Sequence, residues 1–111
     1  MIVYSGRDAY DRDNSHPLWG SGPTRPGLHA SCLTFLRESD SAVLVWDMLD
    51  TMPGTVHGSI YSLGLALLDN AELRPLAEAC AEEKRYEFLF FTAPLVVVGG
   101  TGSPVNPVAL F

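Results

Sequence analysis

The residues best suited to chemistry in this 111-residue chain are His57 and Asp69, a histidine and a carboxylate twelve positions apart. A neutral imidazole and a carboxylate are ligands that Zn²⁺ or Mn²⁺ accepts, and either group can also serve as a general base. Two ligands are fewer than the three that a catalytic zinc site usually takes from its protein. A helix-cap histidine and a turn aspartate with no shared role therefore remain the alternative interpretation.

Whether these two side chains meet depends on the segment between them. In one straight helix they would lie about 18 Å apart along the axis and about 120° apart around it, so they could not share a site. If the helix ends at Gly64, a common C-terminal cap residue, and residues 65–68 return as a strand, the helix advances about 10 Å. Five extended residues at ~3.3 Å each span up to about 16 Å, enough to bring Asp69 back over that distance. This path predicts that His57 and Asp69 meet.

The other two histidines and both cysteines favour structural roles. His16 lies in a stretch rich in glycine and proline, where a solvated or capping residue is a simpler interpretation than a ligand contact. His29 is expected in the first turn of a helix, as a surface or boundary residue. Cys32 and Cys80 have no CxxC spacing, so we expect two buried or half-buried thiols in a reducing, cytoplasmic compartment.

An acidic cluster and a glycine-rich loop each resemble a ligand site in part. Asp8, Asp11 and Asp13 lack the glycine and the closing glutamate of a calcium loop, which favours a solvated loop. Residues 99–103 lack the lysine of a phosphate loop, and Pro104 prevents a helix whose N-terminus would hold a phosphate. A tight connection between two strands is the expectation there.

The apolar pattern predicts an α/β fold with a mixed sheet flanked by helices. The expected elements are a short strand over 2–4, a helix over 28–36, a strand over 42–46, a helix over 56–64, a strand over 65–68, a helix over 74–84, a β-prone stretch over 86–98 interrupted by Pro94, and a terminal strand over 107–111. The continuous apolar run 42–46 is typical of a strand buried on both faces of a parallel sheet. Residues 47–50 follow it at the carboxyl end, where ligands collect in open α/β sheets.

Composition limits both the size and the partners of the protein. A chain of 12.0 kDa has room for one domain with a modest core. Its 13 acidic and 7 basic residues give a net charge of -6, which leaves no basic patch for nucleic acid or for an anionic membrane. The longest apolar run, 88–98, is about half the ~20 residues that cross a bilayer. No secretory signal is readable, so we expect a soluble cytoplasmic protein.

Six short motifs are spread over nearly the whole chain. They are Pro-Gly-Leu-His at 26–29, Val-Leu-Val at 43–45 closing on Asp47, Val-His at 56–57, Leu-Leu-Asp-Asn at 67–70, Arg-Tyr-Glu-Phe at 85–88, and Gly-Gly-Thr-Gly-Ser-Pro-Val-Asn-Pro at 99–107. Together they resemble the cyclase family of metal-dependent hydrolases, which includes kynurenine formamidase and isatin hydrolase.

The resemblance implies a fold of the swivelling β/α/β type and a metal site for Zn²⁺ or Mn²⁺. His57 would be a metal ligand and a catalytic residue, and Asp69 would be the acidic ligand, which is usually a glutamate in this family. The metal would activate water to hydrolyse a small-molecule amide or lactone, as in the arylformamidase of tryptophan catabolism.

The family's signature motif, HxGTHxDxPxH, supplies most of the metal ligands and has no match here. The chain has three histidines, and no two are four residues apart. We therefore expect one truncated cyclase-like domain over 1–111, the C-terminal portion of such a hydrolase. It would bind no metal alone and would share a site with a chain that supplies the missing N-terminal half.

Two alternatives remain open. The chain could be a catalytically inactive, metal-free remnant that acts as an oligomeric or partner-binding module, or an ordinary folded fragment with no function of its own. A sheet cut from a larger unit exposes edges and apolar faces that favour pairing with another chain. We therefore expect a homo-oligomer, held by the strand within 88–98 or by residues 6–27, a long loop acting as an arm.

Overall fold

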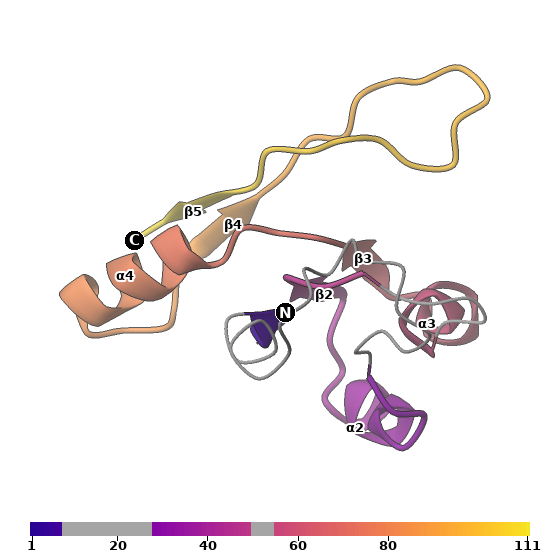
Figure 1. Cartoon of the computed structure of the whole chain (residues 1–111), viewed down its shortest axis with the longest axis horizontal. Helices are drawn as coiled ribbons and strands as arrows, with labels where there is room; N and C mark the ends of the chain where they lie inside the picture. Colours follow the sequence, from indigo (N-terminus) through magenta and orange to yellow (C-terminus); the bar gives the residue numbers. More distant parts are fainter. Residues whose placement is uncertain (8–27, 50–54) are drawn as a thin grey trace, which may run out of the picture. The chain divides into compact units, whose positions relative to one another are not determined.

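The computed structural model describes residues 1–7, 28–49 and 55–111, which divide into two compact units, Met1–Leu73 and Arg74–Phe111 (Figure 1). The first unit contains a parallel sheet and the second an antiparallel one. The predicted α/β class, with both kinds of strand pairing and flanking helices, is confirmed, and each kind of pairing has its own sheet. The expectation of one domain stays a prediction. The predictions for His16, the acidic cluster and most of the 6–27 loop lie outside the described residues.

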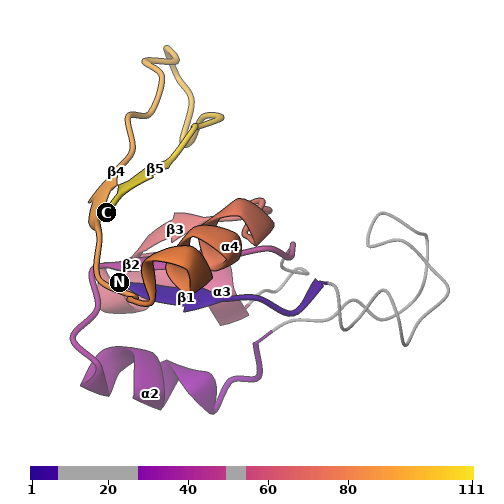
Figure 2. The ribbon, with the colours of Figure 1, turned by 90° about the vertical axis from the view of Figure 1, so that its left-hand side faces the viewer.

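The first unit is built on a three-stranded parallel sheet in the order β1-β2-β3, whose strands lie side by side in Figure 2. Its elements are β1 (Ile2–Tyr4), α2 (Cys32–Glu38), β2 (Val43–Trp46), α3 (Thr55–Leu63) and β3 (Ala66–Leu68). In the central strand, Val45 pairs with Val3 on one side and with Leu68 on the other. Because all three strands run in the same direction, their carboxyl ends meet at one edge of the sheet.

The core of this unit lies between β2 and the two helices. Leu44 and Trp46, on one face of β2, are completely buried and cluster with Leu36 of α2 and Val56 of α3. Val45 points to the opposite face and is also buried. The prediction that this strand is buried on both faces is confirmed.

Helix α2 begins at Cys32, so the prediction that His29 lies in the first turn of the helix is wrong by three residues. His29 lies in a turn, and its backbone carbonyl accepts the N–H of Cys32 at 2.9 Å. The imidazole Nδ1 of His29 accepts the backbone N–H of Ser31 at 3.3 Å. Such local side-chain bonds compete with helical hydrogen bonding and delay the start of the helix. The histidine is exposed, as expected.

The reversal between α3 and β3 takes place at Gly64. The helix ends at Leu63, and Gly64 has a φ of +69°, a left-handed conformation that glycine adopts without steric cost. The N–H of Leu65 then donates to the carbonyl of Ser59 at 3.4 Å, and β3 begins one residue later. The predicted path, a helix followed at once by a returning strand, is confirmed.

The second unit contains α4 (Arg74–Glu83) and an antiparallel hairpin of β4 (Leu89–Phe91) and β5 (Val108–Leu110). The rings of Phe88 and Phe111, which flank the paired residues, lie 5.3 Å apart. The Arg85 guanidinium lies 5.6 Å from the centre of the Phe111 ring, within cation–π range. The predicted terminal strand is confirmed.

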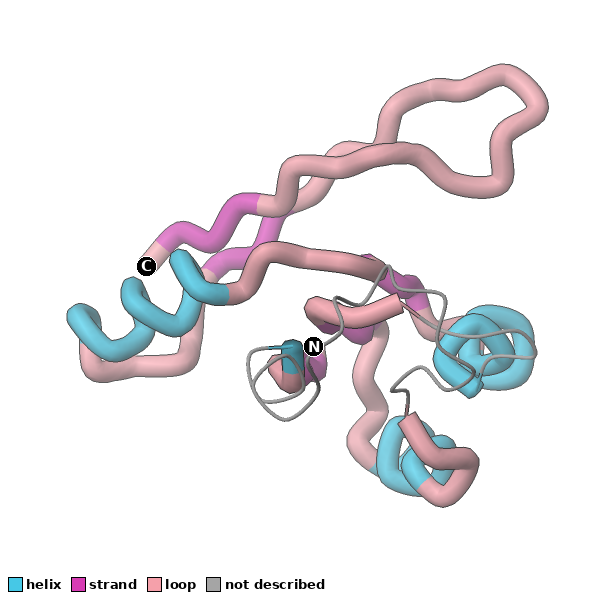
Figure 3. Tube along the Cα trace, viewed as in Figure 1, coloured by secondary structure: helices cyan, strands magenta, loops and turns pink. Residues whose placement is uncertain are grey.

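The predicted β-structure over 86–98 is confirmed at Leu89–Phe91 and wrong on both sides of it, and Figure 3 shows the connection between β4 and β5 as a loop. Pro94 has no N–H to donate to a partner strand. The N–H of Leu95 donates instead to the Ser103 hydroxyl at 2.9 Å. The N–H of Gly100 donates to the Val97 carbonyl at 3.0 Å, which closes a local turn. The glycine-rich segment lies inside the loop over 92–107, so the expected tight connection between two strands is wrong.

The helices of the described residues are short. The longest, α4, has ten residues, and no helix in this part of the chain has the length and apolar character to cross a bilayer. Cys80 on α4 is buried and Cys32 on α2 is half-buried, and both are free thiols, as predicted.

Replacing Gly64 by alanine should lower the free energy of unfolding by about 1–2 kcal/mol, the cost of a left-handed conformation for an L-residue. Gly58 is the matched control, because it lies inside α3 and an added Cβ meets nothing within 4 Å. Gly58→Ala should raise the stability by up to about 1 kcal/mol through helix propensity. Urea denaturation measures both, and effects of the same sign would contradict the assigned helix end.

Candidate functional site

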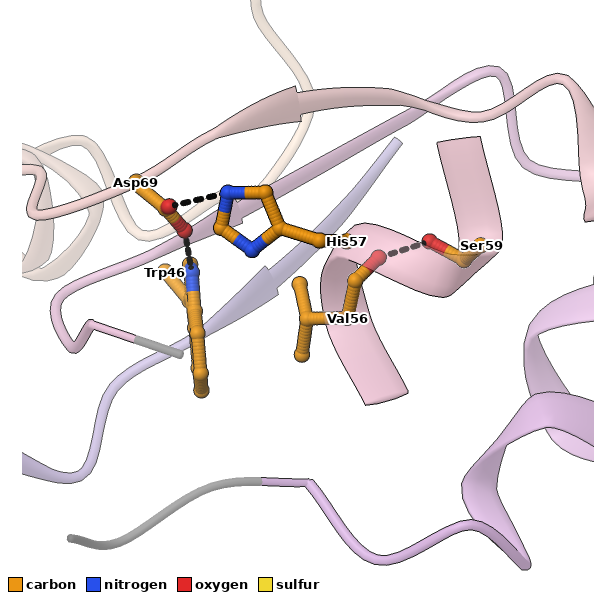
Figure 4. A network of polar contacts seen from close by, with 5 residues as sticks. All are labelled: Trp46, Val56, His57, Ser59 and Asp69. Carbon is orange, nitrogen blue, oxygen red and sulfur yellow. Dashed lines mark hydrogen bonds and ion pairs between the residues drawn. The ribbon is translucent and has the colours of Figure 1, made fainter. Parts of the chain in front are cut away.

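Three side chains from consecutive elements meet at the carboxyl edge of the parallel sheet (Figure 4). Trp46 is the last residue of β2, His57 lies in the first turn of α3, and Asp69 directly follows β3. The Nε2 atom of His57 lies 3.2 Å from Oδ2 of Asp69. The predicted meeting of this histidine and this carboxylate is confirmed. Their roles as metal ligands remain proposals.

The indole of Trp46 holds the other oxygen of the carboxylate, because its N–H donates to Oδ1 of Asp69. Trp46 is completely buried, so its N–H needs a partner inside the protein. The strand register provides that partner, since Val45 pairs with Leu68 and the next residues along are Trp46 and Asp69. A hydrogen bond to an ionised carboxylate contributes about 1.5–3 kcal/mol. Asp69 is thus held by one oxygen while the other faces His57.

Backbone hydrogen bonds fix the chain on the far side of Asp69. The N–H of Asn70 donates to the carbonyl of Met48 at 3.1 Å, and the N–H of Ala71 donates to the carbonyl of Trp46 at 2.9 Å. Asn70 adopts a φ of +53°, a conformation that asparagine tolerates better than most residues. The position of the Asp69 carboxylate therefore follows from main-chain contacts between β3 and the end of β2.

A second carboxylate at this edge, that of Asp47, is buried and is used to join strands. It accepts the hydroxyl of Ser5 at 2.8 Å, the N–H of Gly6 at 3.0 Å and the N–H of Arg7 at 3.3 Å. The Arg7 guanidinium in turn donates to the side-chain oxygen of Asn70. These bonds connect the residues that follow β1 to those that follow β2 and β3.

The pair fits part of a metal site. Two atoms bound to one ion at about 2.0–2.2 Å lie roughly 2.8–3.5 Å apart, which includes the 3.2 Å between His57 and Asp69. Their side chains are 45% and 24% exposed, so solvent reaches them. Within 1–7, 28–49 and 55–111, no group of three histidine, cysteine, aspartate or glutamate side chains is placed to hold an ion. A metal site that used this pair would therefore need further ligands from elsewhere.

The same geometry also has a meaning without a metal. An imidazole that contacts a carboxylate through one nitrogen is oriented by it, and a histidine oriented in this way can act as a general base. The side chain of Asp69, one methylene shorter than that of a glutamate, is long enough to reach His57. A metal would use Nε2 and Oδ2, whereas a general base held by Asp69 through Nε2 would take its proton on Nδ1.

Trp46 and Asp47 were not among the predicted site residues. A tryptophan at the end of an otherwise apolar strand signals a need for a hydrogen-bond acceptor, and the parallel neighbour of Trp46 is Asp69. For Asp47, the signal is the Ser5-Gly6 turn after β1, whose hydroxyl and N–H groups end at the same sheet edge. Both signals need the strand order and register, which a single sequence does not provide.

No family model and no curated protein matches the chain. A solved crystal structure, described as that of a novel cyclase, is similar to it with a TM-score of 0.66 and 29% sequence identity. The match covers 78% of this chain and 31% of that one, so the chain spans about a third of the cyclase's length. The finding supports the resemblance to the cyclase family and the cyclase-like fold without distinguishing among hydrolases. This chain is therefore similar, in sequence and in fold, to one part of a cyclase.

Proposed function

We propose that His57 and Asp69 supply two ligands of a Zn²⁺ or Mn²⁺ site in a cyclase-type hydrolase of amides or lactones. The observation that carries the proposal is the 3.2 Å separation of Nε2 and Oδ2, which suits two ligand atoms on one ion. The remaining ligands would come from polypeptide outside the described residues, in the same protein or in a partner chain. The similar cyclase supports this division, because the match covers 31% of it.

The chain's own residues would divide the work of holding the ion. When bound, the metal would activate a water molecule and polarise the substrate carbonyl. His57 would bind through Nε2, the atom that faces Asp69. Asp69 would bind through Oδ2 alone, because its Oδ1 accepts the indole N–H of Trp46. Trp46 would then be a positioning residue that stops the carboxylate from rotating.

The substrate is expected to be a small amide or lactone. This part of the proposal rests on the family resemblance, which includes the arylformamidase of tryptophan catabolism and isatin hydrolase. The half-exposed imidazole of His57 is compatible with a substrate that approaches from solvent. Activity would require the polypeptide that carries the missing HxGTHxDxPxH motif.

A metal-free role is the second candidate, and one observation favours it. Both oxygens of Asp69 already have partners within the chain, Trp46 on one and His57 on the other. A network that satisfies itself in this way stabilises the end of the sheet without a metal. In that case the protein would act as an oligomeric or partner-binding module.

Metal titration separates the two candidates. In the Trp19→Phe variant, Trp46 is the one remaining tryptophan of the chain. Because its indole contacts Asp69, Zn²⁺ or Mn²⁺ at this site should change the Trp46 fluorescence in a saturable way when a polypeptide that carries the missing motif is present. Calorimetry should give the same affinity. Asp69→Asn and His57→Gln should each weaken binding by at least about tenfold, as loss of a metal-site contact does.

His29→Gln is the control for this experiment, because His29 is an exposed histidine bonded to Ser31. It should leave the titration unchanged. The titration is also run without that polypeptide, where little or no binding is expected. No saturable response with either metal, with and without that polypeptide, would overturn the metal site and favour the module.

The positioning role of Trp46 is tested by a double-mutant cycle with Trp46→Phe and Asp69→Ala, because an asparagine would keep an oxygen that accepts the indole N–H. Trp46→Phe removes the indole donor and also shrinks a core side chain, so the single variant alone does not isolate the hydrogen bond. The coupling energy between the two positions should be about 1–2 kcal/mol in urea denaturation. Trp46→Phe should also weaken metal binding by about 10–100-fold. Additive effects on stability would show that the bond positions nothing.

A further inference from the structure

Arg7 crosses the carboxyl edge of the parallel sheet from the end of β1 to the end of β3. Its backbone N–H donates to Oδ2 of Asp47 at 3.3 Å, and its guanidinium Nη2 donates to the side-chain oxygen of Asn70. Asp47 is buried and directly follows Trp46, whereas Asn70 directly follows Asp69. Arg7 is thus bonded to the residue that comes after each of two neighbouring site residues.

The guanidinium of Arg7 lies against the protein instead of extending into water. Arg7 is half-buried, and its Nε is buried without a hydrogen-bond partner among the described residues. An arginine at a strand end could keep every donor solvated by extending outward, so the observed orientation costs free energy. The bond to Asn70 and the backbone bond to Asp47 offset part of that cost.

Asn70 is the residue through which Arg7 can act on Asp69. Its φ of +53° is a left-handed conformation, which costs free energy for a residue with a Cβ. Its N–H donates to the Met48 carbonyl at 3.1 Å, but an asparagine side chain competes for nearby backbone groups. The bond from Arg7 occupies the side-chain oxygen and removes that competition. Asn70 is therefore held by its backbone to the chain after β2 and by its side chain to the chain after β1.

We propose that Arg7 is a positioning residue for the candidate site, which fixes the Asp69 carboxylate opposite His57 by holding Asn70. Trp46 restrains one carboxylate oxygen, whereas Arg7 restrains the main chain that carries the carboxylate. A guanidinium suits this role because its planar fork of donors is rigid. The effect of Arg7 on metal affinity rests on the proposed function. Its effect on Asp69 does not, since the bond between Trp46 and Asp69 can be measured without a metal.

Hydrogen exchange of the Trp46 indole N–H, followed by NMR in the Trp19→Phe background without metal, tests the proposal. Arg7→Met and Asn70→Gly should each speed this exchange at least about threefold, because the acceptor Asp69 becomes more mobile. Arg7→Met removes the donors and keeps an unbranched side chain, and Asn70→Gly removes the acceptor but permits the left-handed conformation. Asn70→Asp keeps an acceptor for Arg7 and should exchange as slowly as the parent.

A double-mutant cycle shows whether Arg7 acts through Asn70. In the Asn70→Gly variant, Arg7→Met should have no further effect on the indole exchange. Arg37→Met, which removes the exposed arginine in the last turn of α2, is the matched control and should leave the exchange unchanged. When the polypeptide with the missing motif is present, Arg7→Met should also weaken Zn²⁺ or Mn²⁺ binding by about tenfold.

Three results would overturn the positioning role. They are an indole exchange rate that Arg7→Met leaves unchanged, an equal rise in exchange at the indole and at the backbone N–H of Val45, and additive effects of Arg7→Met and Asn70→Gly. The second would report a general loss of stability, because Val45 lies in the centre of the sheet. If the parent binds neither metal, the proposed metal site fails, and the exchange rates still decide the role of Arg7.

Discussion

The parallel pairing of β2 with both of its neighbours is the constraint on which the candidate site depends. It brings the ends of three strands to one edge, so the residues after each strand become neighbours. The Asp47 carboxylate accepts a hydrogen bond from Ser5 in the turn after β1, and the Trp46 indole donates one to Asp69 at the end of β3. The register that buries Trp46 also presents the carboxylate to His57. A shift of β3 by one residue would turn Asp69 to the other face of the sheet.

The hydrogen bonds at this edge differ in what they do. Those of Asp47 are formed with Ser5, Gly6 and the backbone of Arg7, and they hold loops together. The carboxylate of Asp69 has one oxygen in the same kind of structural bond and the other beside a half-exposed imidazole. Both oxygens of Asp47 are therefore used in structural hydrogen bonds, whereas Asp69 has one oxygen beside His57 that could bind a ligand.

The sequence predicts the elements that follow from local pattern. The fully apolar run before Asp47 predicts a central strand, and Gly64 predicts where the helix stops, so the meeting of His57 and Asp69 follows from helix and strand lengths. The start of α2 is predicted less well, because a side-chain bond of His29 competes with the helix. The indole contact of Trp46 depends on strand register, a long-range property that residue types alone do not encode. The run after Phe91 looks like a strand in sequence and is a loop in the structure, where Pro94 lacks the N–H that a partner strand would need.

The sharp reversal at Gly64 fixes how many residues can separate His57 from Asp69. The chain leaves His57 along α3 and returns along β3, and only Gly64 and Leu65 lie between the helix and the strand. The number of residues between His57 and Asp69 is therefore fixed by the geometry. The contact thus depends on a fixed pattern: a histidine, a glycine seven positions later, and an acidic residue five positions after the glycine. An insertion or a deletion inside this span would move Asp69 relative to His57 and break their contact.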